Sequence, residues 1–195
     1  SYSRYVLFLA VLASGYSYAQ GNDQQQSQDA LFACHIRASL VNSGEPVFWT
    51  DLEPCNLALT GSSGRLSPAQ HLATLLNRAI LLMELTEFER AREDLETASL
   101  ADPLSPALQI NLGLLDFFEQ QYEDAITNFS LAVESEEFRA LGLFNRCLAY
   151  GYSDSFDLAL EDLAQLKLEY PQEFSSWASL EQSDFFADLL ARLPE

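Results

Sequence analysis

The chain has 195 residues, and 48% of them are apolar, which is enough to bury a sizeable core and excludes wholesale disorder. Its 29 acidic residues outnumber its 10 basic ones, for a formal net charge of −19. This balance excludes the basic stripe that nucleic-acid binding requires and predicts repulsion from anionic membrane surfaces. The acidic charge is typical of a solubilising exterior, and the alternative is a surface whose field steers a basic partner.

The first residues have the pattern of an export signal. After an early arginine, residues 5–13 (YVLFLAVLA) are apolar, and Ser17 and Ala19 fit the small-x-small cleavage pattern. This run is too short to cross a bilayer as a helix, which takes about 20 apolar residues. We therefore expect a signal peptide over 1–19, cleaved near the Ala19–Gln20 bond, and an exported, periplasmic protein without stable membrane insertion after its removal. Retention of the segment as an anchor is the alternative.

A polar linker and a short helical segment are predicted to follow. Residues 20–28 are polar and glutamine-rich, which is typical of a flexible linker. Over 29–67 we expect an N-terminal helical segment, with one helix over 29–40 and another within 49–59. The turn residues NSGEP at 42–46 separate the two helices.

The three cysteines fall into two settings. An exported protein tolerates disulfides, and we expect Cys34 and Cys55 to pair because they lie close in sequence and outside the repeats described next. Cys147 stands within a predicted helix, where it is expected to be a buried free thiol. A zinc site formed by the first two cysteines with His35 and His71 is the alternative, but its spacing matches no metal-binding pattern.

A 34-residue self-similarity runs through residues 68–173, after Ser67 and Pro68, which are typical of a helix start. Four columns keep the period through three copies: Asn77, Asn111 and Asn145; Phe88, Tyr122 and Phe156; Ala91, Ala125 and Ala159; and Leu95, Phe129 and Leu163. A fixed period of this length indicates helical hairpins stacked into a solenoid. We expect repeats over 72–105, 106–139 and 140–173.

A capping helix is expected over 174–195. A solenoid exposes its last apolar face unless a terminal helix covers it. The apolar stripe of this segment consists of Phe186, Leu189, Leu190 and Leu193. The sequence therefore predicts that this stripe packs against the third repeat.

The repeats resemble the tetratricopeptide repeat family. That family has a small residue in the first helix, then an aromatic, an alanine, a large apolar residue, an alanine and a proline along the second. The matching residues are Ala79, Phe88, Ala91, Leu95, Ala98 and Pro103; then Gly113, Tyr122, Ala125, Phe129 and Ala132; then Cys147, Phe156, Ala159, Leu163 and Pro171. The resemblance implies an all-α fold: a short right-handed α-solenoid of helix-turn-helix repeats with an N-terminal helical extension and a C-terminal capping helix.

Several positions depart from the family pattern, among them the tryptophan column, which holds Leu75, Gln109 and Leu143, and the last alanine of the third copy, which is Leu166. The column that is leucine in the family holds Arg78 and Arg146, and only Leu112 conforms. Asp116 falls at a position where the other copies are apolar. The small residues of the remaining columns are expected to let paired helices approach closely, and the aromatic that opens each second helix is expected to fill the gap between copies.

The resemblance implies a concave partner-binding groove lined by the first helices. Its lining residues in this chain are Leu76, Asn77, Ile80, Met83 and Glu84; Ile110, Asn111, Leu114, Phe117 and Phe118; and Phe144, Asn145, Leu148 and Tyr152. The groove is mostly apolar, and the basic residues with which one branch of the family binds acidic peptide tails are missing. Either residues 29–60 fill this groove, or it is open to an amphipathic or extended segment of another protein.

No pattern in the sequence indicates catalysis. The glycines form no nucleotide-binding loop, and both histidines lie outside the core of the repeats. We therefore expect no catalytic residues, no metal, no cofactor and no enzymatic activity. The predicted function is a periplasmic protein–protein interaction scaffold or assembly adaptor that binds an apolar or amphipathic segment of a partner protein. The alternative is a structural accessory subunit of a larger, hetero-oligomeric cell-envelope complex, with the groove permanently occupied.

Overall fold

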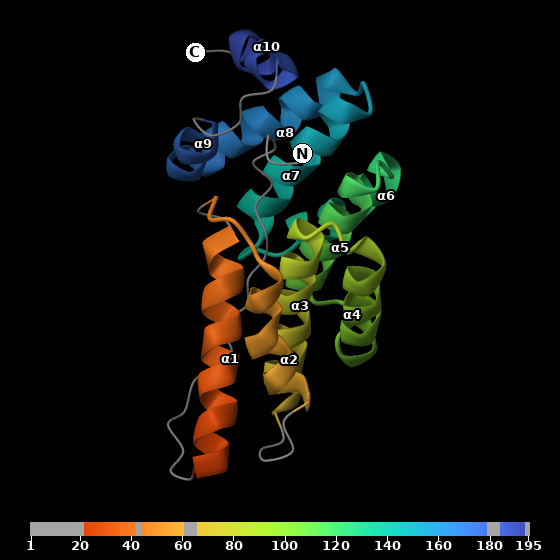
Figure 1. Ribbon diagram of the computed structural model, residues 1–195. Coiled ribbons are helices and arrows are strands. Elements are labelled where there is room, and N and C mark those ends of the chain that lie inside the picture. Colours follow the sequence, from red (N-terminus) through yellow and green to blue (C-terminus); the bar gives the residue numbers. More distant parts are fainter. Residues whose placement is uncertain (1–21, 42–43, 61–65, 179–183, 194–195) are drawn as a thin grey trace. The chain divides into compact units, whose positions relative to one another are not determined.

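The computed structural model describes residues 22–41, 44–60, 66–178 and 184–193, and these contain helices and no strand (Figure 1). The elements are α1 (Asn22–Val41), the 3₁₀ helix η1 (Trp49–Leu52), α2 (Glu53–Thr60), α3 (Pro68–Glu84), α4 (Phe88–Ala101), α5 (Pro106–Phe118), α6 (Tyr122–Val133), α7 (Arg139–Tyr152), α8 (Phe156–Glu169), α9 (Pro171–Ala178) and α10 (Asp184–Arg192). The predicted all-α class is confirmed. The predicted signal peptide lies outside the described residues.

The chain forms two compact units, one ending at Asn111 and the other beginning at Leu112, so that the boundary falls within α5. In the first unit, α1 packs along both α2 and α3, and α4 packs against α3 (Figure 1). Helix α1 buries Leu31, Cys34 and Ala38, which share one face because they are three or four residues apart. The N-terminal helical segment is therefore part of the core of the first unit.

Helix α1 begins earlier than the sequence suggested. The polar residues expected as a flexible linker over 20–28 belong from Asn22 onward to α1. Glutamine has a helix propensity close to that of glutamate and lysine. A glutamine-rich stretch therefore extends a helix once its C-terminal half is fixed by packing. The low apolar content of this stretch therefore did not indicate a flexible linker.

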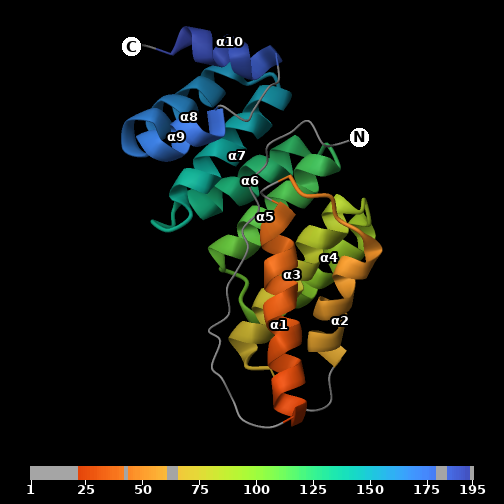
Figure 2. The same cartoon turned by 60° about the vertical axis from the view of Figure 1, so that its left-hand side comes forward.

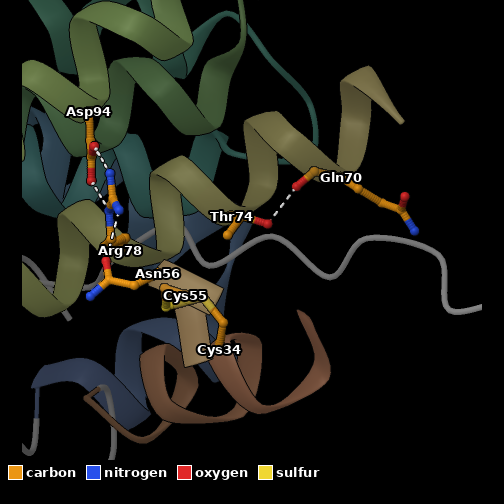
Figure 3. The surroundings of a disulfide bond; sticks show 7 residues. All are labelled: Cys34, Cys55, Asn56, Gln70, Thr74, Arg78 and Asp94. Atoms are coloured by element: carbon orange, nitrogen blue, oxygen red, sulfur yellow. Dashed lines mark hydrogen bonds and ion pairs between the residues drawn. A yellow bond between two sulfur atoms is a disulfide. The ribbon is translucent and has the colours of Figure 1, made fainter. Parts of the chain in front are cut away.

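A disulfide between Cys34 and Cys55 joins α1 to α2, as predicted (Figure 3). The two Cα atoms are 4.8 Å apart, and both side chains are fully buried. The pairing closes a loop across a sequence separation of 21 residues, which contains η1. The disulfide thus fixes the short helix α2, which has few apolar side chains of its own to bury.

Replacing Cys34 and Cys55 together by alanine is expected to lower the free energy of unfolding by about 3 kcal/mol, because the closed loop restricts the unfolded chain by about that amount. Urea unfolding followed by circular dichroism measures the change. A reductant should bring the native chain down to the stability of the variant and leave the variant unaffected. Equal stability of the oxidised native chain and the variant would contradict this account.

The three repeat copies share one turn between their paired helices. Thr86, Gln120 and Asp154, each 34 residues apart, adopt left-handed backbone angles with φ of 61°, 64° and 58°. In each copy this residue donates its N–H to the carbonyl three residues earlier, and the next residue donates to the carbonyl five earlier, as in Glu87 to Leu82 at 2.9 Å. This is the Schellman arrangement, in which the last carbonyls of a helix find partners. The 34-residue period is therefore a period of backbone geometry as well as of side chains.

Thr86→Gly is expected to raise the free energy of unfolding by about 1 kcal/mol, because a β-branched residue is strained at positive φ and glycine is not. The control is Thr97→Gly within α4, which is expected to lower the free energy of unfolding by roughly 0.5 kcal/mol because glycine disfavours a helix interior more than threonine does. Thermal unfolding of both variants measures the two effects. A destabilised Thr86→Gly would show that the hydroxyl, and not the backbone angle, matters at this turn.

In the second unit the small and aromatic columns occupy the places that the sequence predicted. Ala125 and Ala159 are fully buried, and a Cβ at Gly113 would lie 2.6 Å from the ring of Phe129, so the glycine permits α5 and α6 to approach closely. The ring of Tyr122 lies 5.4 Å from that of Phe117 in its own copy and 5.8 Å from that of Tyr152 in the next. The aromatic that opens α6 therefore bridges two successive copies.

The C-terminal segment consists of two short helices instead of the single capping helix expected over 174–195. Pro171 begins α9, which packs against α8, and α10 packs against both α7 and α8 (Figure 2). Phe186 and Leu189 of the predicted stripe are fully buried. The ring of Phe185 occupies the space that a Cβ at Gly151 would need, so a glycine is required where α10 meets α7.

Candidate protein-binding site

The residues of the predicted groove are, with two exceptions, buried. Glu84 has an exposed side chain and Tyr152 is half-buried. The buried ones are Leu76, Asn77, Ile80 and Met83 of α3; Ile110, Asn111, Leu114, Phe117 and Phe118 of α5; and Phe144, Asn145 and Leu148 of α7. An apolar side chain in the interior is not accessible to a partner unless part of the chain moves. The role of these residues in partner binding stays a prediction.

In the first unit, the N-terminal helices lie against the helix that carries the first part of the predicted groove. Both α1 and α2 pack against α3, whose Leu76 and Ile80 are fully buried. This packing favours the alternative in which residues 29–60 cover the groove of the first copy. Glu84 remains exposed at the end of α3, and partial desolvation raises the pKa of its carboxyl above the ordinary value.

In the second unit, the two C-terminal helices cover the residues predicted to line the groove of the third copy. The ring of Phe144 lies 5.4 Å from that of Trp177 in α9 and 5.8 Å from that of Phe186 in α10. Tyr152 meets Phe185 of α10 edge to face, with ring centroids 5.0 Å apart. The C-terminal segment was expected to pack against the third repeat, but it was not expected to cover residues of the predicted groove.

The arginines that depart from the family pattern hold helices together. Arg78 of α3 donates from Nε and Nη2 to the carboxylate of Asp94 in α4, at 2.8 and 2.6 Å, and from Nη1 to Oδ1 of Asn56 in α2, at 2.8 Å (Figure 3). Asp94 is almost fully buried. One guanidinium therefore connects its own helix to the helix before it and to the helix after it.

The same arrangement recurs two periods later. Arg146 of α7 donates from Nε and Nη2 to Asp162 in α8, at 2.8 and 2.7 Å, and from Nη1 to Oγ of Ser130 in α6, at 3.1 Å. Burial raises the pKa of the Asp162 carboxyl, and the hydrogen bonds from Arg146 act in the opposite direction. The hydrogen bond with Asp162 in turn raises the pKa of Arg146. Arg146 thus offsets part of the desolvation of Asp162, and the hydrogen bond with Asp162 outweighs the desolvation of Arg146.

The middle copy connects its two helices by a polar pair that contains no arginine. Leu112 occupies the arginine column and Asn128 the aspartate column. The Asn128 amide donates to Oδ2 of Asp116 at 2.8 Å, which accounts for a buried acid where the other copies are apolar. The two departures from the family pattern are therefore alternative pairings of the same two helices.

Arg146→Leu is expected to lower the free energy of unfolding by about 3 kcal/mol, because it leaves the Asp162 carboxylate buried without its partner. The double variant Arg146→Leu/Asp162→Asn, which copies Leu112 and Asn128 of the middle repeat but not Asp116, is expected to recover part of that loss because it removes the unpaired buried charge. The control is Arg192→Leu, which removes an exposed ion pair with Asp188 and is expected to cost less than about 1 kcal/mol. A double variant as unstable as the single one in urea unfolding would contradict this interpretation.

The described residues contain no group of three or more histidine, cysteine or acidic side chains placed to hold a metal ion. The cysteines of the alternative zinc site form the disulfide instead. Cys147 is buried and forms no disulfide bond, as predicted. Among the described helices, none combines the length and the apolar character that crossing a membrane requires.

Compared with models of protein families, with curated proteins and with solved structures, this chain matches none.

Proposed function

We propose that this protein is a helical-repeat scaffold or assembly adaptor that binds a segment of another protein on the first helices of its repeats. The observation that carries the proposal is the period itself. Side-chain columns, left-handed turns and arginine pairs all recur at 34 residues or twice that spacing. Repeated helical hairpins of this kind stack into solenoids, whose extended faces bind other polypeptides.

In this proposal α10 is a displaceable cover of the binding face. It contributes few deeply buried side chains, chiefly Phe186 and Leu189, and contacts Tyr152 through Phe185. An amphipathic helix of a partner that presents aromatic residues at similar spacing competes with α10 for α7. The exported, periplasmic location predicted from the sequence is part of the proposal, and the disulfide is compatible with it.

A structural accessory subunit of a cell-envelope complex is the second candidate, and the burial of the predicted groove favours it. If the chain's own helices cover the face permanently, a partner must bind elsewhere and hold the protein in a stable complex. Gel filtration of native extract distinguishes the two. A complex of fixed stoichiometry supports the subunit, whereas transient capture supports the adaptor.

Phe185→Ala is expected to increase partner capture severalfold, because it loosens α10 from Tyr152 and so exposes the face of α7. The control is Leu168→Ala, which alters an equally apolar but exposed side chain in α8. Affinity purification from the source cells with quantitative mass spectrometry measures the amount captured. Identical capture by the two variants and the native chain would contradict the adaptor proposal.

A further inference from the structure

Two neighbouring hollows lie along one side of α1, in the first unit. The larger, of about 430 Å³, is lined by Asp29, Ala30, Ala33, Arg37, Thr50, Asp51, Glu53, Pro54 and Leu57. The smaller, of about 120 Å³, is lined by Arg37, Leu40, Glu45, Pro46, Val47, Phe48 and Asp51. Because Arg37 and Asp51 line both, the two hollows form one groove, which we name the α1 groove. The disulfide between α1 and α2 fixes its two walls relative to each other.

The groove follows a single stripe of α1. Asp29, Ala33, Arg37 and Leu40 stand four, four and three residues apart, which places them on one face of the helix. At about 1.5 Å per residue the stripe is roughly 16 Å long. An extended segment of about five residues has the same length at roughly 3.3 Å per residue. The groove therefore has the dimensions of a short peptide site.

Each hollow contains a large apolar side chain that remains exposed. Leu57 in the larger hollow is 42% exposed, and Phe48 in the smaller one is 61% exposed. Ala33 and Pro54 add apolar surface to the larger hollow. Exposed aromatic and aliphatic side chains within a concave site are typical anchors for a partner. The groove thus offers two apolar anchor points, one at each end.

The charged residues of the groove indicate which kind of partner segment it can bind. Among the described lining residues, four carry carboxylates (Asp29, Glu45, Asp51 and Glu53) and one carries a guanidinium, Arg37. The Arg37 Nε lies 3.2 Å from Oδ1 of Asp51, so this positive charge is compensated within the groove. Asp51 is itself held in place, because its Oδ2 accepts the backbone N–H of Phe48 at 2.8 Å. The remaining surface of the groove is negative.

We propose that the α1 groove binds a basic, apolar segment of a partner protein, in which lysine or arginine side chains alternate with apolar ones. Its apolar residues contact Leu57 and Phe48, and its basic residues face Glu53 and Glu45. A second copy of this chain fits poorly, because each copy carries a formal charge of −19 and the two repel each other. This groove contains none of the residues of the first-helix face, so the inference is independent of the proposed function.

The test uses the full chain and a fluorescent seven-residue peptide of alternating lysine and leucine, with binding followed by fluorescence anisotropy at physiological salt. Leu57→Ser, Glu53→Lys and Glu45→Lys are each expected to weaken binding about fivefold or more. The matched controls in α4, Leu100→Ser and Glu96→Lys, make the same chemical changes at exposed positions and are expected to leave binding unchanged. Peptides with glutamate for lysine, or serine for leucine, should not bind.

Several results would overturn the inference. Equal weakening by the control variants would show that the peptide is attracted by the overall charge, and equal binding of the glutamate peptide would show that charge plays no part. Failure of the lysine–leucine peptide to bind would show that the α1 groove is not a site for basic, apolar segments. Self-association that Leu57→Ser abolishes would assign the groove to a second copy of the chain. Peptide binding that appears only after removal of residues 1–19 would assign it to the chain's own N-terminal segment.

Discussion

The close approach of paired helices at columns of small residues is the constraint on which this structure depends. Ala91, Ala125 and Ala159 are fully buried, and a larger residue at Gly113 would collide with the ring of Phe129. Close approach requires each pair of helices to be connected by a turn that reverses the chain within a few residues. The left-handed residue after each first helix provides that turn, at the same position in every copy.

Polar pairs give the hairpins a second, more specific connection. An arginine that contacts both the preceding and the following helix permits only the geometry in which both sets of partners are within reach. Such a pair contributes little net stability relative to apolar residues of the same volume, but breaking it is costly. The leucine, asparagine and aspartate of the middle copy show that the hairpin itself tolerates another solution. The hairpins therefore depend on a complete set of partners, not on one residue type in a single column.

The predicted groove and the α1 groove differ in how accessible their lining residues are. The first-helix residues that the family resemblance indicates are mostly buried, in the second unit beneath aromatic residues of α9 and α10. The α1 groove is accessible and negative, and it carries exposed apolar side chains.

The sequence by itself determined the helical class, the 34-residue period, the disulfide and the burial of the third cysteine. These features depend on local spacing, which one chain displays directly. The extension of α1 into the glutamine-rich residues, the division of the C-terminal segment into two helices and the position of those helices over Phe144 became clear only from the tertiary structure. Whether a polar stretch continues a helix depends on the packing of the helix that it joins, and whether an apolar face is covered depends on which distant side chains reach it. Periodicity within a single element carries no information about such contacts, because they are made between elements far apart in the chain.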